Sequence, residues 1–190
     1  LALVGDDPET HLREATRLIS EDKIEESLSR LRRACPFARD GVIQVLRLFT
    51  TQVLDAKGGA PPWGDDAFLL LTRLDSQDNI AFIHWGNLLG ELAQLTAQKD
   101  PKAAQDLFHQ AFEKYQKAIG IKPDFHEAFY NWGSHLGNLA QLIAQKTPKA
   151  AQDLFHQAFE KYQKAVGIKP DNHEAFYNWG SHLGNLAQLI

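Results

Sequence analysis

HEAFYNWGSHLGNLAQLI, residues 126–143, recurs without a change at residues 173–190. The stretch belongs to a longer unit, because residues 97–143 and 144–190 agree at all but three of 47 positions. The copies differ at Asp100/Thr147, Ile119/Val166 and Phe125/Asn172. A unit that cannot bury its own apolar face gains a core by stacking on its neighbour. The duplication therefore predicts an open solenoid with a binding surface rather than a globule with one pocket.

Each copy divides into two amphipathic helices. The apolar residues of the first helix recur every three or four positions, which is one stripe of an α-helix. They are Phe129, Trp132, Leu136, Leu139 and Ile143. The second helix would bury Ala151, Leu154, Phe155, Ala158, Phe159, Tyr162, Ala165 and Val166. Each unit is therefore predicted to be an αα-hairpin.

Capping signals set the expected helix boundaries. An acidic residue followed three positions later by Glu has the form of a capping box, which predicts that the first helix starts at Asp124 and again at Asp171. A capping side chain before proline, at Asp100 and Thr147, predicts the start of the second helix. Gly167 and the proline that follows it would end that helix.

Two glycines, Gly133 and Gly137, fall inside the first helix. Each costs about 1 kcal/mol relative to alanine in a helix interior, so each needs a reason. Close approach of the second helix or of the next unit is the preferred explanation. A flexible hinge is the alternative.

A partial copy precedes the duplicated pair. Residues 81–95 align 47 positions ahead of the next first helix, and residues 65–74 would form the helix before them. The loop signal GGAPP at residues 58–62 predicts a boundary. We expect repeats over residues 64–190, in units of about 78–124, 125–171 and 172–190. Residues 1–57 form either a degenerate hairpin that caps the solenoid or a separate small helical domain.

The spacing Phe129-x-x-Trp132-Gly133-x-x-Leu136, followed by Ala158-x-x-x-Tyr162, resembles the tetratricopeptide (TPR) repeat. The resemblance implies an all-α, right-handed α-solenoid of antiparallel helix hairpins. The family repeat has about 34 residues, so this unit is longer, and the extra residues fall at the hairpin tip as nearly two turns per arm. HEAT and armadillo repeats share the length, but the Trp-Gly spacing tells against them.

The same resemblance implies that a protein or peptide binds on the concave face formed by successive first helices. The groove residues carried over from the family are Tyr130, Asn131, Ser134, Asn138 and Gln141 in one unit, Tyr177, Asn178, Ser181, Asn185 and Gln188 in the next, and Ile83, His84, Asn87, Glu91 and Gln94 in the first. Tyrosine and amide side chains suit an extended backbone or a neighbouring helix. A solvated face without a ligand is the alternative.

Composition and motifs exclude several classes of function. A net charge of −4 predicts no nucleic-acid or membrane partner. No apolar run reaches the length of a membrane span, and the single cysteine, Cys35, fits a reducing compartment, so a cytoplasmic location is expected. His126 and Glu127 begin a zinc-protease motif, but Tyr130 stands at the second ligand position. We therefore expect no enzyme, no metal and no cofactor.

These features predict a protein-interaction scaffold. The alternative is a regulatory or sensor arm of a larger enzyme or defence-type effector, in which the N-terminal helices dock. That alternative rests on residues 19–28, ISEDKIEESL, which resemble helical effector-associated adaptor domains. In the partial unit 172–190, the first helix is not followed by a second helix that would cover its apolar residues. We expect that the natural chain continues, or that another chain covers this edge through self-association.

Overall fold

The computed structural model describes residues 10, 14–15, 17–18, 23–34, 40–44, 46–47 and 64–189. All secondary-structure elements in these residues are helices, which confirms the all-α class. The chain divides into two compact units, Leu1–Ala81 and Phe82–Ile190.

The first unit contains α2 (Ile24–Ala34) and α4 (Gly64–Leu74). Its core is small and aliphatic: Ala15, Leu31, Val42, Ile43, Leu46, Ala67, Leu71 and Ala81. The buried Ser27 hydroxyl donates a hydrogen bond of 2.8 Å to the Ala15 carbonyl, so this polar group is satisfied inside the core. The GGAPP loop expected as a boundary lies outside the described residues. The division into residues 1–57 and 64–190 therefore stays a prediction.

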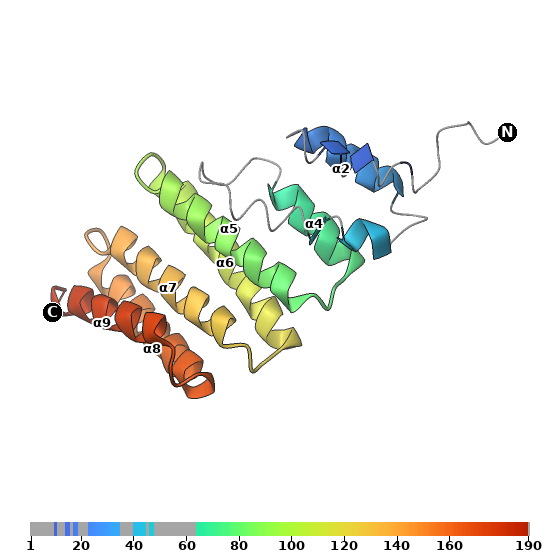
Figure 1. The fold of residues 1–190 in the computed structure, drawn as a ribbon. Helices are drawn as coiled ribbons and strands as arrows, with labels where there is room; N and C mark the ends of the chain where they lie inside the picture. Colours follow the sequence, from blue (N-terminus) through green and yellow to red (C-terminus); the bar gives the residue numbers. More distant parts are fainter. Residues whose placement is uncertain are drawn as a thin grey trace. The chain divides into compact units, whose positions relative to one another are not determined.

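Two helix hairpins and a final single helix form the second unit (Figure 1). The helices are α5 (Asn79–Thr96), α6 (Pro101–Ile121), α7 (His126–Ile143), α8 (Pro148–Ile168) and α9 (His173–Ala187). The hairpins α5–α6 and α7–α8 each consist of two long antiparallel helices. Stacked hairpins of this kind form an α-solenoid of TPR-like repeats, which confirms the predicted fold class.

The predicted stripes lie in the core of these hairpins. Phe129, Leu136 and Leu139 of α7 are buried, and Trp132 and Ile143 are half-buried. From α8, the buried residues are Ala151, Phe155, Ala158, Tyr162 and Ala165. The remaining members of its predicted set are half-buried and pack against the same clusters. Helices α7 and α8 therefore bury the faces that their sequence spacing predicts.

The predicted capping boxes are wrong by one residue. The N-cap of α7 is Phe125, which has no side-chain oxygen and makes no capping bond. In α9 the N-cap is Asn172, whose Oδ1 accepts a bond of 3.1 Å from the backbone N–H of Ala175. Because each helix begins one residue later than expected, Glu127 is at the second helical position and cannot close the box.

The second helices begin where predicted, but their caps differ. Asp100 Oδ1 accepts bonds of 3.1 and 3.0 Å from the backbone N–H groups of Lys102 and Ala103. Thr147 makes no such bond, and its hydroxyl donates at 3.3 Å to the Ile143 carbonyl instead. Two of the three differences between the copies therefore lie at helix N-caps and change the quality of the cap.

The predicted stop at Gly167 is one residue early, since α8 continues to Ile168. The backbone N–H of Lys169 still donates to the Ala165 carbonyl at 2.9 Å. The helix ends because Pro170 cannot supply the next backbone donor and disfavours a helical conformation at the residue before it.

Exchanging the two caps tests this description. Thr147→Asp should stabilise the chain by about 0.5–1 kcal/mol, because an aspartate at this position can accept from the free N–H groups of the first turn. Asp100→Thr should destabilise it by a similar amount. Chemical denaturation of both variants and of the double exchange measures the effect. If neither single variant moves the midpoint, the caps do not act as described.

Candidate functional site

A buried tyrosine hydroxyl joins three helices in the first full repeat. Tyr115 of α6 donates a hydrogen bond of 2.6 Å to Oδ1 of Asn87 on α5. The same oxygen lies 2.9 Å from Nδ1 of His135 on α7. Because the tyrosine proton goes to Asn87, Nδ1 of His135 carries a hydrogen and donates it to Tyr115. We call these three residues the first hub. The buried Tyr115 hydroxyl therefore has two partners, which offsets the cost of its burial.

The second hub repeats this arrangement 47 residues later. Tyr162 of α8 lies 3.2 Å from Nδ1 of His182 on α9. Ser134 of α7 stands at the position of Asn87 and lies close enough to lower the pKa of Tyr162, against the larger effect of burial, which raises it. In both hubs a phenylalanine of the second helix packs on the imidazole, with ring centroids 6.0 Å apart for Phe108 and His135 and 5.8 Å apart for Phe155 and His182.

Glycines make room for the hubs. A Cβ added to Gly133 would lie 3.0 Å from the Tyr162 ring and 3.1 Å from the Ala158 carbonyl oxygen. At Gly137, an added Cβ would meet the ring of His182. Gly86 and Gly90 bear the same relation to Tyr115 and His135. Close packing, and not a hinge, is therefore the reason for glycine at these helical positions.

Burial changes the acid–base properties of the hubs. It lowers the pKa of His135 from its ordinary value of 6.5 to about 4, and lowers the pKa of His182 as well. The pKa of the Tyr115 hydroxyl is raised well above its ordinary value, by burial first and by the charge of Glu91 second. Both histidines are consequently neutral at physiological pH, as a buried hydrogen-bonded ring requires.

The predicted groove residues lie on α5, α7 and α9 with unequal exposure. Glu91, Gln141, Tyr177, Ser181 and Gln188 are exposed, whereas His84, Asn87, Tyr130, Asn131, Ser134, Asn138, Asn178 and Asn185 are half-buried. Tyr177 is the most open of the large side chains, at 78% exposed. Ile83 departs from the prediction, because it is only 2% exposed and belongs to the core.

One contact links the polar faces of neighbouring first helices. Nδ2 of Asn178 on α9 donates a hydrogen bond of 3.1 Å to the Tyr130 hydroxyl on α7. Glu174 acts electrostatically on the same hydroxyl, whose pKa is raised by burial first and by this carboxylate second. The structure therefore brings Tyr130, Glu174 and Asn178 together. Asn87, in contrast, accepts its hydrogen bond from the hub residue Tyr115.

Sequence reasoning missed the histidines of the hubs and the carboxylate beside Tyr130. His135 follows the polar residue Ser134, and polarity alone assigned it to no face. The signal in the sequence is the repeated pairing of a helical glycine with a later histidine. Gly90 lies against His135, and Gly137 lies against His182. The sequence places Glu174 only in a capping box, at its third position after Asp171.

The described part of the chain offers no group of three or more His, Cys, Asp or Glu residues that could hold a metal ion. Cys35 lies outside the described residues. Among the helices that the structure describes, none combines the length and apolar character needed to cross a membrane.

Residues 71–182 match the model of the family described as plant-specific mitochondrial import receptor subunit TOM20. Among solved structures, the chain is similar to YrrB, described as a TPR protein with an unusual peptide-binding site. That similarity has 17% identity and a TM-score of 0.39 over 90% of this chain and 91% of the other, and a score this low supports no functional comparison. No curated protein matches the chain.

The expected cytoplasmic location is wrong, because the matching family is described as a mitochondrial import receptor subunit. The prediction rested on net charge, hydropathy and the single cysteine. These properties do not identify the organelle with which a protein associates.

The buried histidines make stability depend on pH. The folded pKa of His135 is depressed, so its contribution is complete above the unfolded value of 6.5 and is lost as pH falls toward about 4. Between pH 7 and pH 5 the free energy of unfolding should fall by about 2 kcal/mol on account of this residue.

Replacing the ring tests this dependence. His135→Phe keeps an aromatic ring in the site and should flatten the pH profile over that interval, as measured by urea denaturation. His156→Gln, a change at an exposed histidine, serves as the matched control. Equal profiles for the wild-type chain and His135→Phe would contradict a neutral buried imidazole.

Proposed function

The chain belongs to the family of the plant-specific mitochondrial import receptor subunit TOM20, and we propose that it is a non-catalytic scaffold that binds protein targeting segments on the polar face of α5, α7 and α9. The binding of a protein or peptide follows from the receptor family and from the helical-repeat fold. The choice of face and of targeting segment is the proposal. The alternative, a regulatory arm of a larger enzyme, rests on the resemblance of residues 19–28 alone.

The observation that carries the proposal is the hydrogen bond between Tyr130 and Asn178. This bond connects the polar faces of α7 and α9, so that side chains from two repeats lie on one surface. Asn131 and Tyr177, which are the repeat equivalents of Asn178 and Tyr130, flank this contact. A ligand lying across the two helices would meet tyrosine and amide groups at a regular spacing.

Charge on this face suits one class of ligand. Mitochondrial targeting segments are amphipathic, rich in arginine and poor in acidic residues. Glu91 and Glu174 are exposed carboxylates on α5 and α9, and the net charge of the chain is −4. The exposed ring of Tyr177 offers both apolar area and a cation–π surface to an arginine. Carboxylates and tyrosines together therefore favour a basic amphipathic segment.

Binding of a synthetic arginine-rich amphipathic peptide tests the proposal. The double variant Tyr130→Ala with Tyr177→Ala should weaken binding about tenfold or more, because aromatic side chains dominate such interfaces. Glu174→Gln should weaken it less, and the effect should diminish at high salt because exposed charges are screened. Isothermal titration at two salt concentrations provides the measurement.

Two controls separate binding from folding. Tyr130→Phe removes only the hydroxyl that bonds to Asn178, and Lys164→Ala changes an exposed residue on α8. The Lys164 variant should bind as the wild-type chain does, and circular dichroism should show intact helices throughout. Wild-type affinity in the double alanine variant would place the binding site on another face.

A further inference from the structure

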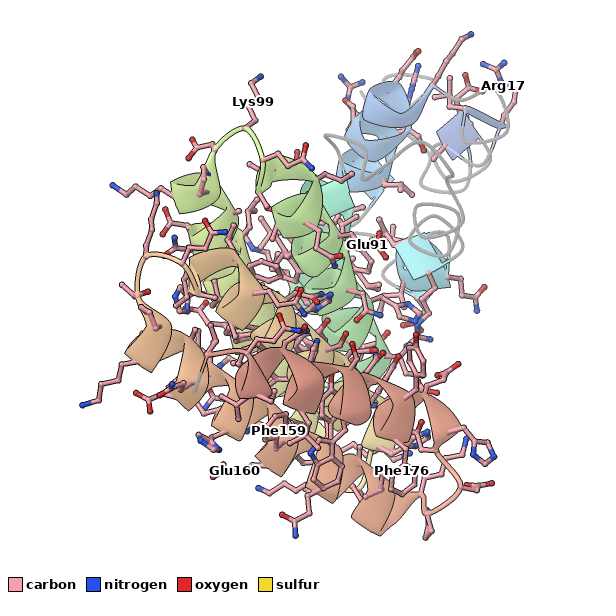
Figure 2. All side chains as sticks on the ribbon, turned by 90° about the vertical axis from the view of Figure 1, so that its left-hand side faces the viewer. Arg17, Glu91, Lys99, Phe159, Glu160 and Phe176 are labelled. Carbon is pink, nitrogen blue, oxygen red and sulfur yellow. The ribbon has the colours of Figure 1, made fainter. Side chains whose placement is uncertain are left out.

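The polar face contains one carboxylate that the later repeats lack. Glu91 lies in the second half of α5 (Figure 2), and its equivalents in α7 and α9 are Asn138 and Asn185. Helices α7 and α9 also carry a single carboxylate each, at Glu127 and Glu174, but both lie in the first helical turn. There the helix N-terminus stabilises a negative charge. Glu91 is too far along α5 for this interaction, so helix stability does not explain its presence.

The surroundings of Glu91 do not compensate its charge. The residue is exposed, yet partial burial of its carboxyl group raises the pKa of that group. The carboxylate also adds to the effect of burial in raising the pKa of the Tyr115 hydroxyl, so it lies close to the first hub. No lysine or arginine occurs in α5, α7 or α9.

No counter-ion reaches this carboxylate from elsewhere in the part of the chain that the structure describes, because no cation there forms an ion pair with Glu91. A partly desolvated carboxylate without a counter-ion lowers the stability of the fold. Carboxylates in such surroundings are typical of functional positions. Glu91 is therefore a candidate for pairing with a cation that arrives with the ligand.

An exposed leucine lies beside this carboxylate. Leu95 follows Glu91 by one helical turn, so the two side chains are neighbours on the surface of α5. Leu95 is 65% exposed. Its equivalent Leu142 is half-buried and packs against the cluster that contains Phe108. Among the described repeats, the first alone therefore presents a carboxylate and an open apolar side chain together.

We propose that Glu91 selects the charge of the bound segment by pairing with one of its arginines, while Leu95 contacts an apolar side chain of the same segment. This inference rests on the targeting-segment proposal above, and it names the residue that provides the charge selectivity of that site. A segment that binds as a helix would carry the arginine and the apolar residue three or four positions apart.

Arginine suits this position better than lysine. Its planar guanidinium donates two parallel hydrogen bonds to one carboxylate, and it is more weakly hydrated than an ammonium group. It therefore loses less on entering partly desolvated surroundings, where the attraction between opposite charges is also stronger than in water. The pair would supply the counter-ion that α5, α7 and α9 lack.

A double-mutant cycle between the chain and a peptide tests the pairing. The probe is a synthetic arginine-rich amphipathic peptide, together with a set in which citrulline replaces one arginine at a time and so removes the charge while keeping the shape. In isothermal titration, Glu91→Gln should weaken binding of the parent peptide about tenfold, because a close charge pair is lost. One citrulline peptide should bind the wild-type chain equally weakly and lose no further affinity in Glu91→Gln.

Two variants and one further measurement separate this pairing from general charge and from folding. Glu113→Gln removes the same charge from an exposed position on α6, outside the polar face, and should bind every peptide nearly as the wild-type chain does. Leu95→Ala should weaken binding by a smaller factor than Glu91→Gln. Without peptide, Glu91→Gln should raise the midpoint of urea denaturation, because an uncompensated carboxylate has been removed.

The possible results distinguish this inference from the proposed function. Peptide binding that is lost in the double variant Tyr130→Ala with Tyr177→Ala, but is unchanged in Glu91→Gln, would overturn the role of Glu91 and leave the polar face as the binding site. Weaker binding in Glu91→Gln without coupling to any single arginine would contradict the pairing, since only a long-range charge effect would remain. A lowered denaturation midpoint in that variant would assign the carboxylate to the fold instead. No peptide binding by the wild-type chain would overturn both proposals.

Discussion

The repeats depend on one steric constraint, which is the close packing of a tyrosine ring against a glycine in the preceding helix. Tyr115 and Tyr162 can be fully buried only because Gly86 and Gly133 have no side chain. Their hydroxyls then need partners inside the core, which the next first helix supplies through His135 or His182. Tyr115 has a second partner in Asn87 of the preceding helix. The imidazoles in turn need Gly90 and Gly137. One steric requirement thus fixes the spacing of glycine, tyrosine and histidine across three successive helices.

The sequence itself shows how far this pattern extends. Forty-seven positions before Tyr115 and His135 stand Phe68 and Leu88, so the hydroxyl and the imidazole are absent together. The groove residue Tyr130 is likewise replaced by Ile83, which cannot make the hydrogen bond to the following helix. The first repeat is therefore apolar at positions where the later repeats use hydrogen bonds.

Periodicity and duplication were enough to predict the class, the hairpins and most of the buried faces. Helix starts were less predictable, because Asp124 and Glu127 have capping-box spacing while the backbone begins its helix after Phe125. The reason for Gly133 and Gly137 was also accessible, since a repeated glycine that costs stability indicates packing. Which ring fills each glycine was not accessible, because that depends on contacts between residues about 20 to 50 positions apart. The prediction of a cytoplasmic location was wrong for a different reason, because amino-acid composition does not determine where in the cell a protein is found.

The helices α7 and α9 allow the same substitution to be made in two environments. Gly137→Ala places a methyl group against the ring of His182, whereas Gly184→Ala, at the equivalent position, meets open space. The decisive measurement is the free energy of unfolding of the two variants. The structure predicts that Gly137→Ala destabilises the chain by about 1–3 kcal/mol through overpacking, and that Gly184→Ala stabilises it by up to about 1 kcal/mol through helix propensity. Shifts of the same sign and size in both variants would contradict the account.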